Sequence, residues 1–439
     1  MYRLYSWEHS YFSGKARAYL RYKERTGGLA PGYEDVLATP AIIQGLLLPA
    51  TGTAAVPQLQ RPDGSWIQDS SEIIDELEEA HPEPAVVPPV SSPRQRLVSY
   101  LVELLADEWM VVWGFCERWH HSLAGVEPNH LDFNALQWGS VLAPEADGDA
   151  RLAAGHAFFE TVFGIKEART DPRAVYAGLV QLGVTEHTHD AWKASNDRLL
   201  GHLEAHFGKH DYLLGGRPSL GDFGLMGPLY AHLFRDAASG FELRTRFPLV
   251  AEWVERTNGS NALNARTYDQ TLYVLDESGE LIGRPAGSDG ADWLADDALA
   301  PTLEPILAIF FEEMWPVLQS SVERLRAYLS SDDHREGSEV PGKTFTATPG
   351  FEAHQTGEGA LTHEFEIGGV RERRMVLPYQ VWMLGRMEQA LAPCLPAPQA
   401  RASLEKLLAP MPGGAGLLEL DALLEGVRLR KALGRLYPA

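Results

Sequence analysis

The length, composition and charge of the chain set the first limits on its function. A single hydrophobic core rarely serves more than about 250–300 residues, so a chain of 439 residues is expected to form two or three structural units. Acidic residues outnumber basic ones by 60 to 38, which argues against a nucleic-acid partner because phosphates need a basic face. The two cysteines, Cys116 and Cys394, form no CxxC pair, so a dithiol redox centre is not expected.

The first residues of the chain and the lengths of its apolar runs indicate where the protein is located in the cell. The segment MYRLYSWEHSYFSGKAR lacks the apolar core of a signal peptide, and no uninterrupted apolar run reaches the about 18 residues that span a bilayer. We therefore expect a cytoplasmic protein that does not enter a membrane.

The first 81 residues alternate short strand patterns with helical patterns. Thr39 followed by Pro40 is typical of a helix start, and Arg61–Gly64 is typical of a tight turn. The expected strands are 2–6, 33–37, 56–60 and 65–67, and the expected helices are 14–25, 41–48 and one that begins at Ser70. This order, a βαβ unit followed by ββα, predicts a compact α/β domain over residues 1–81.

A proline-rich segment separates that domain from a helical one. Five prolines within residues 82–93 are incompatible with a helix or a central strand, so this segment is expected to be a linker. Residues 94–258 follow helical spacing almost throughout. Within them, Ser219 and Asp222 have the spacing of a capping box, which predicts a helix start at this point.

Residues 259–439 are expected to form a mostly helical extension. A small hairpin is predicted from residues 272–274 and 279–282, and a loop over 332–359. The expected helices are 302–329, possibly bent at Pro305 and Pro316, 376–391 and 415–433.

Three segments of the chain resemble the serine-type branches of the glutathione S-transferase superfamily. Residues 2–24 contain LYSxxxSYFSGKAR, residues 56–78 contain VPQL and IQDSSEII, and residues 212–230 contain LLGGRPSLGDFGLMGPLY. The resemblance implies a thioredoxin-like N-terminal domain followed by an all-α C-terminal domain of this family. It covers the first 258 residues and implies nothing firm about the extension.

The resemblance also implies where glutathione would bind. In the family, the proline that corresponds to Pro57 is cis, so that the backbone of the preceding residue, here Val56, faces the cysteinyl part of the ligand. Asp69 and Ser70 would hold the γ-glutamyl end, with Asp69 a shorter variant of the usual glutamate or glutamine. Ser70 would lie at a helix start, where partial positive charge favours a carboxylate.

Three hydroxyl groups are candidates for activating the glutathione thiol, which ionises only near pH 8.5 when free. The family pattern Ser-Pro-Phe/Tyr-Ser-x-Lys matches Ser10–Lys15 except that Tyr11 replaces the proline. Ser10 is the first candidate. Tyr11 competes with it, because Tyr11-Phe12 also resembles the start of tyrosine-type members. Ser13 is the third candidate, and it could equally be only a helix cap.

The second substrate pocket of the family is lined mainly by the first two helices of the helical domain. Trp109 and Trp113 are one turn apart in this region and are our candidates for that pocket, although they could equally belong to the core or to a dimer interface. No metal site is expected, because no further ligands at suitable spacing complete His120-His121 or His187-x-His189. Lys15 and Arg17 are interpreted as helix-surface or interdomain charges, with Arg17 pairing to the second domain.

These features together predict a glutathione transferase, with glutathione as co-substrate and a small hydrophobic electrophile as its partner. A homodimer is possible, as is common in the family. Two alternatives stay open: a non-catalytic, metaxin-like binding or scaffold protein, and a glutathione-dependent peroxidase or dehalogenase.

Overall fold

The computed structural model describes residues 1–122, 125–162, 179–259, 272–284, 292–340, 361–432 and 434–439. Its N-terminal part is an α/β domain. The strands are β1 (Tyr2–Ser6), β2 (Tyr33–Leu37), β3 (Gln58–Gln60) and β4 (Trp66–Gln68), and the helices are α1 (Tyr11–Arg25), α2 (Pro40–Ile42), α3 (Leu48–Thr51) and α4 (Ser70–Ala80). The predicted order of elements is confirmed, and the Thr39 hydroxyl accepts a hydrogen bond from the Ile42 N–H at the start of α2 as its sequence indicates.

The sheet of this domain is small and mixed. Its strand order is β2-β1-β3-β4, with β1 parallel to β2 and antiparallel to β3, and β3 antiparallel to β4. Helix α1 contacts α4 within the domain. It also contacts helices of the following region, so the start of α1 lies near the junction between the two parts.

A helical region follows the proline-rich linker. Its helices are α5 (Pro93–Leu105), α6 (Val111–His120), α7 (Leu131–Leu142), α8 (Gly148–Val162), α9 (His189–Phe207), α10 (Leu220–Met226), α11 (Ala237–Arg246) and α12 (Pro248–Asn258). Wider π-type turns connect α5 to α6 at Ala106–Met110 and follow α10 at Gly227–Phe234. The predicted capping box is confirmed at α10, where the Ser219 N–H donates to the Asp222 carboxylate at 2.8 Å.

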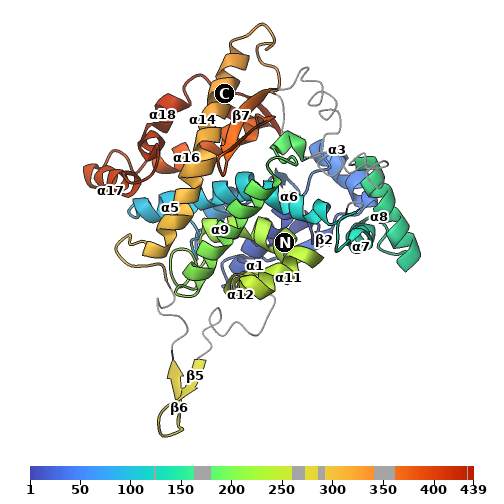
Figure 1. Cartoon of the computed structure of the whole chain (residues 1–439), viewed down its shortest axis with the longest axis horizontal. Helices are drawn as coiled ribbons and strands as arrows, with labels where there is room; N and C mark the ends of the chain where they lie inside the picture. Colours follow the sequence, from blue (N-terminus) through green and yellow to red (C-terminus); the bar gives the residue numbers. More distant parts are fainter. Residues whose placement is uncertain (123–124, 163–178, 260–271, 285–291, 341–360, 433) are drawn as a thin grey trace.

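Where the structure describes it, the extension is helical with three small hairpins. Its helices are α13 (Glu304–Ile309), α14 (Trp315–Leu329), α16 (Pro378–Leu391), α17 (Pro398–Leu408) and α18 (Leu420–Leu423), and its strands are β5 (Leu272–Leu275), β6 (Leu281–Arg284), β7 (Thr362–Ile367), β8 (Val370–Met375), β9 (Leu429–Ala432) and β10 (Arg435–Pro438). The predicted hairpin at β5–β6 is confirmed, and Figure 1 shows it projecting at the edge of the molecule. Of the loop predicted over 332–359, residues 341–359 lie outside the described residues.

The prediction of a helix over residues 415–433 is wrong. The helical part ends with α18 at Leu423, and the chain then forms the antiparallel strands β9 and β10. A helix was predicted here because the leucines of this segment are frequent enough to fit a helical spacing. Gly434, with a φ of +74°, makes the turn between the strands, a conformation that favours glycine.

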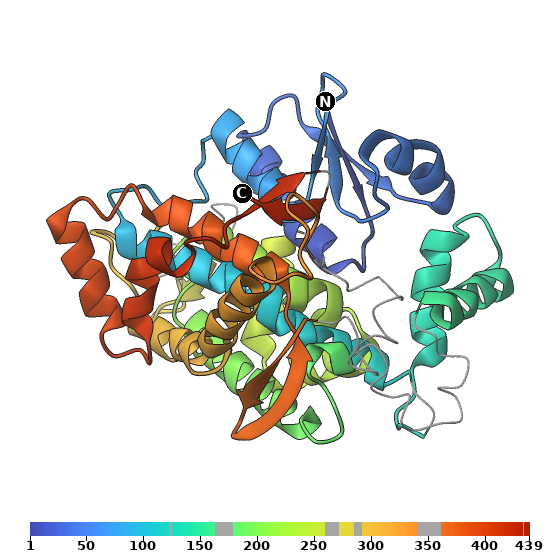
Figure 2. The ribbon, with the colours of Figure 1, turned by 90° about the horizontal axis from the view of Figure 1, so that it is seen from above.

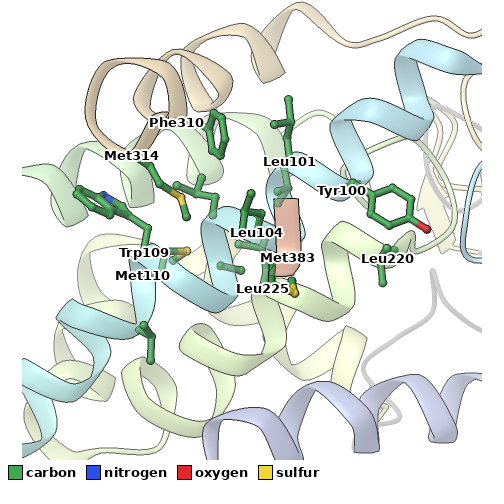
Figure 3. Close-up of a cluster of buried hydrophobic side chains, with 14 of the residues drawn as sticks. Tyr100, Leu101, Leu104, Trp109, Met110, Leu220, Leu225, Phe310, Met314 and Met383 are labelled. Carbon is green, nitrogen blue, oxygen red and sulfur yellow. The ribbon is translucent and has the colours of Figure 1, made fainter. Parts of the chain in front are cut away.

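The extension shares its hydrophobic core with the helical region. One continuous cluster of buried side chains runs from Tyr2 to Leu436. Figure 3 shows Met383 of α16 and Phe310 and Met314 of the extension beside the side chains of α5. Helices α13 and α16 both contact α5, so α5 is covered by the extension. Among the described residues, no helix has the length and apolar character needed to cross a bilayer.

Candidate functional site

The first part of the site is the start of α1, which follows directly after β1 and a short loop. Ser10 caps this helix from an extended conformation, and its Oγ accepts a hydrogen bond from the Ser13 N–H at 3.4 Å. Its side chain is half-buried. The Ser10 hydroxyl therefore lies at the positive end of the helix dipole, a position that favours a nearby anion.

The other two candidate hydroxyls are enclosed in the protein. Tyr11 is 3% exposed, and its hydroxyl donates to the Ala106 carbonyl at 2.5 Å. Burial, with Asp107 and Glu108 nearby, raises the pKa of Tyr11 well above its ordinary value. Ser13 is fully buried, and its Oγ accepts from the Trp7 N–H at 3.4 Å. Tyr11 and Ser13 are thus buried around the start of α1, and a part for either in activating the thiol stays a prediction.

The second part of the site is the loop before β3. The Val56–Pro57 peptide bond is cis, with Val56 half-buried and Pro57 buried. The Gln58 side-chain amide donates to the carbonyls of Thr53 at 3.0 Å and Ala55 at 2.9 Å. These bonds fasten the loop against the sheet and hold its backbone in one conformation.

The third part of the site is the start of α4, where Asp69 and Ser70 lie. Asp69 has a φ of +81°, a left-handed conformation that costs a non-glycine residue of order 1–3 kcal/mol. One of its carboxylate oxygens, Oδ1, caps α4 by accepting from the Ser71 N–H at 2.9 Å. Ser70 is buried at the first position of the helix. The structure therefore places an anionic group and a helix N-terminus side by side, as the sequence predicts.

The extension reaches this third part of the site, which the sequence does not predict. The Tyr379 hydroxyl, at the start of α16, donates to Asp69 Oδ2 at 2.5 Å. The Lys431 ammonium on β9 lies 2.9 Å from the same oxygen and 3.2 Å from Glu72 Oε2. Tyr379 is 310 residues from Asp69 in the sequence, and no local pattern connects them.

A buried charge network lies behind Asp69 and Ser70. The Lys15 ammonium is 2.6 Å from Glu103 Oε1 and 2.5 Å from Asp107 Oδ2, and it donates to the Ser71 hydroxyl at 2.9 Å. Burial alone would lower the pKa of Lys15, but the two carboxylates outweigh it and raise that pKa. Lys15 therefore stays protonated and ties α1 to α5, which confirms its interdomain role.

Arg386 extends the same network from α16. Its guanidinium pairs with Glu103 Oε2 at 2.5 Å and with both carboxylate oxygens of Asp75 on α4. The α/β domain, the helical region and the extension thus meet at one set of buried charges.

Arg17 differs from its prediction. It was expected to pair with the second domain, but it pairs with Glu8 at 3.0 Å and with Asp35, both within the α/β domain. The sequence position of Arg17, two residues after Lys15, puts the two side chains on different sides of α1.

The two tryptophans predicted for a second pocket lie in the core. Trp109 and Trp113 are each 3% exposed. The Trp109 Nε1 donates to Glu313 at 3.2 Å, and its ring lies 4.7 Å from that of Trp192. Their part in an electrophile pocket stays a prediction.

Arg374 on β8 lies against the Trp109 ring, with 5.5 Å from the guanidinium carbon to the ring centroid. It is fully buried, and none of the described residues hydrogen-bonds its guanidinium nitrogens. Burial lowers the pKa of Arg374 to about 10, although Glu108 opposes the shift. A cation without a hydrogen-bond partner among the described residues, and only partly compensated by Glu108, therefore lies in the core beside the predicted pocket.

An open cleft lies away from Ser10, Val56–Pro57 and Asp69. It has a volume of about 500 Å³ and lies beside the C-terminal half of α4, between Glu79, Tyr100 and Arg386. The candidate residues lie at the opposite end of α4 and on other elements, so the cleft gives no support to the predicted site.

The predicted histidines come closer than the sequence suggests. The rings of His120 and His189 are 4.8 Å apart. Even so, no group of three or more His, Cys, Asp or Glu side chains suited to a metal occurs in the part of the chain that the structure describes.

The fold and the site define a class of proteins in which a thioredoxin-like α/β domain precedes an all-helical domain. The family model for the glutathione S-transferase N-terminal domain matches residues 4–85, and that for the C-terminal domain matches residues 186–256. The chain therefore carries the N-terminal and C-terminal domains of the glutathione S-transferase superfamily in these two ranges. A sequence comparison with curated proteins gives no match.

Several solved structures resemble the chain at low identity. A glutathione S-transferase from Rhodospirillum rubrum F11 is 20% identical, with 66% of this chain and 99% of the other covered and a TM-score of 0.30. The beta-etherase LigF from Sphingobium sp. strain SYK-6 is 19% identical, with 60% and 98% covered and a TM-score of 0.39. A glutathione S-transferase from Methylobacterium radiotolerans, solved with glutathione sulfonate, is 20% identical, with 64% and 99% covered and a TM-score of 0.32.

Proposed function

We propose that this protein is a glutathione transferase in which Ser10 stabilises the glutathione thiolate for attack on a hydrophobic electrophile. The two family domains support a function of the glutathione transferase type. The cysteinyl part of glutathione would lie along Val56 and Pro57, and its γ-glutamyl end would lie at Asp69 and Ser70. A carboxylate and a helix start suit the ammonium and carboxylate groups of that end.

The hydrogen bonds of the Ser10 hydroxyl favour Ser10 as the activating residue. Its oxygen accepts a hydrogen bond, while its hydrogen meets no acceptor among the described residues. The Tyr11 hydroxyl, in contrast, already donates to Ala106 in a buried position. Of these two hydroxyls, that of Ser10 is the better placed to donate to a ligand.

Ser10 has only to stabilise the thiolate form of glutathione. A hydroxyl donor and the helix N-terminus both favour the thiolate over the thiol, which lowers the thiol pKa toward neutrality. The thiol proton passes to solvent, the sulfur forms a bond to the electrophilic carbon, and the leaving group departs with its electron pair. The rest of the rate enhancement comes from holding the two reactants together.

The test is a conjugation assay with a chlorodinitrobenzene, together with the ultraviolet absorbance of the bound thiolate. We expect Ser10→Ala to lower kcat by about 10–100-fold and to raise the pKa of bound glutathione toward the free value of ~8.5. Ser140→Ala on the exposed face of α7 is the matched control and should change neither quantity. A Ser10→Ala protein with unchanged kcat and unchanged thiol pKa would remove Ser10 from the mechanism.

A second candidate function is that of a non-catalytic binding or scaffold protein with this fold. The ion pair between Lys431 and Asp69 favours it, because that carboxylate is the one expected to receive the ligand's ammonium group. Calorimetry with millimolar glutathione separates the two functions. Binding without turnover on several classes of electrophile would support the scaffold.

A further inference from the structure

The C-terminal hairpin β9–β10 lies against the start of α4. Figure 2 shows the two terminal strands beside the α/β domain. Lys431 of β9 makes the closest charged contact, at 2.9 Å from Asp69 Oδ2 and 3.2 Å from Glu72 Oε2. A single ammonium group thus serves two carboxylates at this end of the helix.

The surroundings of Lys431 resemble a small binding site for an ammonium group. Its side chain is only 6% exposed, and the ammonium lies 4.8 Å from the Trp382 ring centroid and 5.5 Å from that of Tyr379. Carboxylates together with aromatic faces are the groups that bind ammonium ions. The ammonium is within ion-pair distance of Asp69 but is not aligned for a hydrogen bond, so the attraction is mainly electrostatic.

The turn of the hairpin covers the neighbouring end of the sheet. A Cβ atom on Gly434 would lie 3.0 Å from Gln68 Oε1, so the backbone of the turn approaches the residue next to Asp69. The other side of the hairpin is fastened elsewhere, because the Leu436 carbonyl accepts from the Val340 N–H at 3.0 Å. The hairpin therefore presents Lys431 to α4 from a fixed position.

We infer that the hairpin is an internal ligand of the glutathione site, with the Lys431 ammonium in the place of the ligand's α-ammonium. This inference rests on the proposed function, which assigns Asp69 to the γ-glutamyl end. Two ammonium groups cannot share one carboxylate oxygen at 2.9 Å without strong repulsion. Glutathione binding and the Lys431–Asp69 contact therefore compete, and we expect glutathione to displace the hairpin.

Two other roles of Lys431 give different results on substitution. If the ion pair only stabilised the fold, removing it would leave glutathione affinity unchanged. If Lys431 instead bound the ligand's carboxylate, removing it would weaken binding. Competition alone predicts that binding becomes tighter.

The test is calorimetry of the full chain with glutathione and with its des-amino analogue, which lacks the α-ammonium. We expect Lys431→Met to tighten glutathione binding about tenfold or more, and to tighten binding of the analogue by a clearly smaller factor. Arg435→Met is the matched control, since it removes an exposed cation of the same hairpin that pairs with Glu339; its affinity should stay within about twofold. Lys431→Gln serves as a second variant should Lys431→Met not fold.

Hydrogen exchange gives a readout of the hairpin itself. Saturating glutathione should speed amide exchange in residues 428–439 of the wild-type protein. Unchanged or weaker glutathione binding by Lys431→Met, or unchanged exchange on ligand binding, would overturn the inference and leave the proposed function standing. If neither the wild-type protein nor the variant binds millimolar glutathione, the proposed function fails, and the inference with it. Binding by the variant alone would support both.

Discussion

Replacing Lys15 by methionine should destabilise the protein strongly, because the lysine compensates two carboxylates in the core. Its ammonium lies within 2.6 Å of Glu103 and Asp107, and all three side chains are at most 2% exposed. Glu103 would keep Arg386 as a partner at 2.5 Å, while Asp107 would lose the lysine that compensates its charge. Methionine fills a similar volume, so the main change is the loss of charge.

The expected loss is about 3–5 kcal/mol, the usual cost of breaking a buried ion pair by removing one partner. With a urea dependence of about 3 kcal/mol per molar for a chain of this size, the unfolding midpoint should fall by roughly 1–1.7 M. Urea titrations followed by tryptophan fluorescence and circular dichroism measure this shift.

Two further variants test whether the burial of these charges accounts for the expected loss of stability. Lys193→Met removes an ammonium that also pairs with two carboxylates, Asp197 and Glu242, but the lysine side chain is 39% exposed. It should cost no more than about 1 kcal/mol. Adding Asp107→Asn to Lys15→Met should restore part of the stability. If Lys15→Met cost less than about 1 kcal/mol, the account of a desolvated charge network would be wrong.

The remaining predictions concern two other buried charges. Arg374→Met should leave stability unchanged or raise it by about 1–4 kcal/mol, because the cost of burying this guanidinium without hydrogen bonds outweighs its attraction to Glu108. A loss of stability in thermal melts would show that the attraction to Glu108 is the larger of the two. Burial raises the pKa of Glu117 from 4.5 to about 7, so the folded protein binds more protons than the unfolded chain between these values. The free energy of unfolding of the wild-type protein should therefore fall by about 3 kcal/mol as the pH rises from 4.5 to 7, because Glu117 ionises freely in the unfolded chain while its burial in the core opposes ionisation. The Glu117→Gln variant should not show this fall. Urea midpoints of both proteins from pH 4.5 to 7.5 measure the difference, and parallel profiles would contradict it.

The parts of the fold that sequence predicts well are those with local signals. Thr39 and Pro40 start α2, and the capping box of Ser219 and Asp222 starts α10, because each signal acts within one helical turn. The hairpin β5–β6 follows from the turn chemistry at Asp276–Gly279, where the Gly279 N–H donates to the Asp276 carbonyl at 3.0 Å.

The parts that sequence predicts poorly depend on long-range contacts. A helix was expected to continue to residue 433, because the leucine spacing fits one and the partner of the hairpin that forms instead lies at the other end of the chain. The contact of Arg17 with Asp35 forms only once β2 lies beside β1. The contacts of Tyr379 and Lys431 with Asp69 likewise need the complete tertiary structure.

The shared core has a consequence for the synthesis of this protein. Helix α16 contacts α5, so the apolar side chains of α5 lack this partner until residues up to Leu391 have left the ribosome. At about 5–20 residues per second, the roughly 290 residues between α5 and the end of α16 take about 15–60 s to make. We therefore expect α5 of the nascent chain to lack one of its apolar partners for that time.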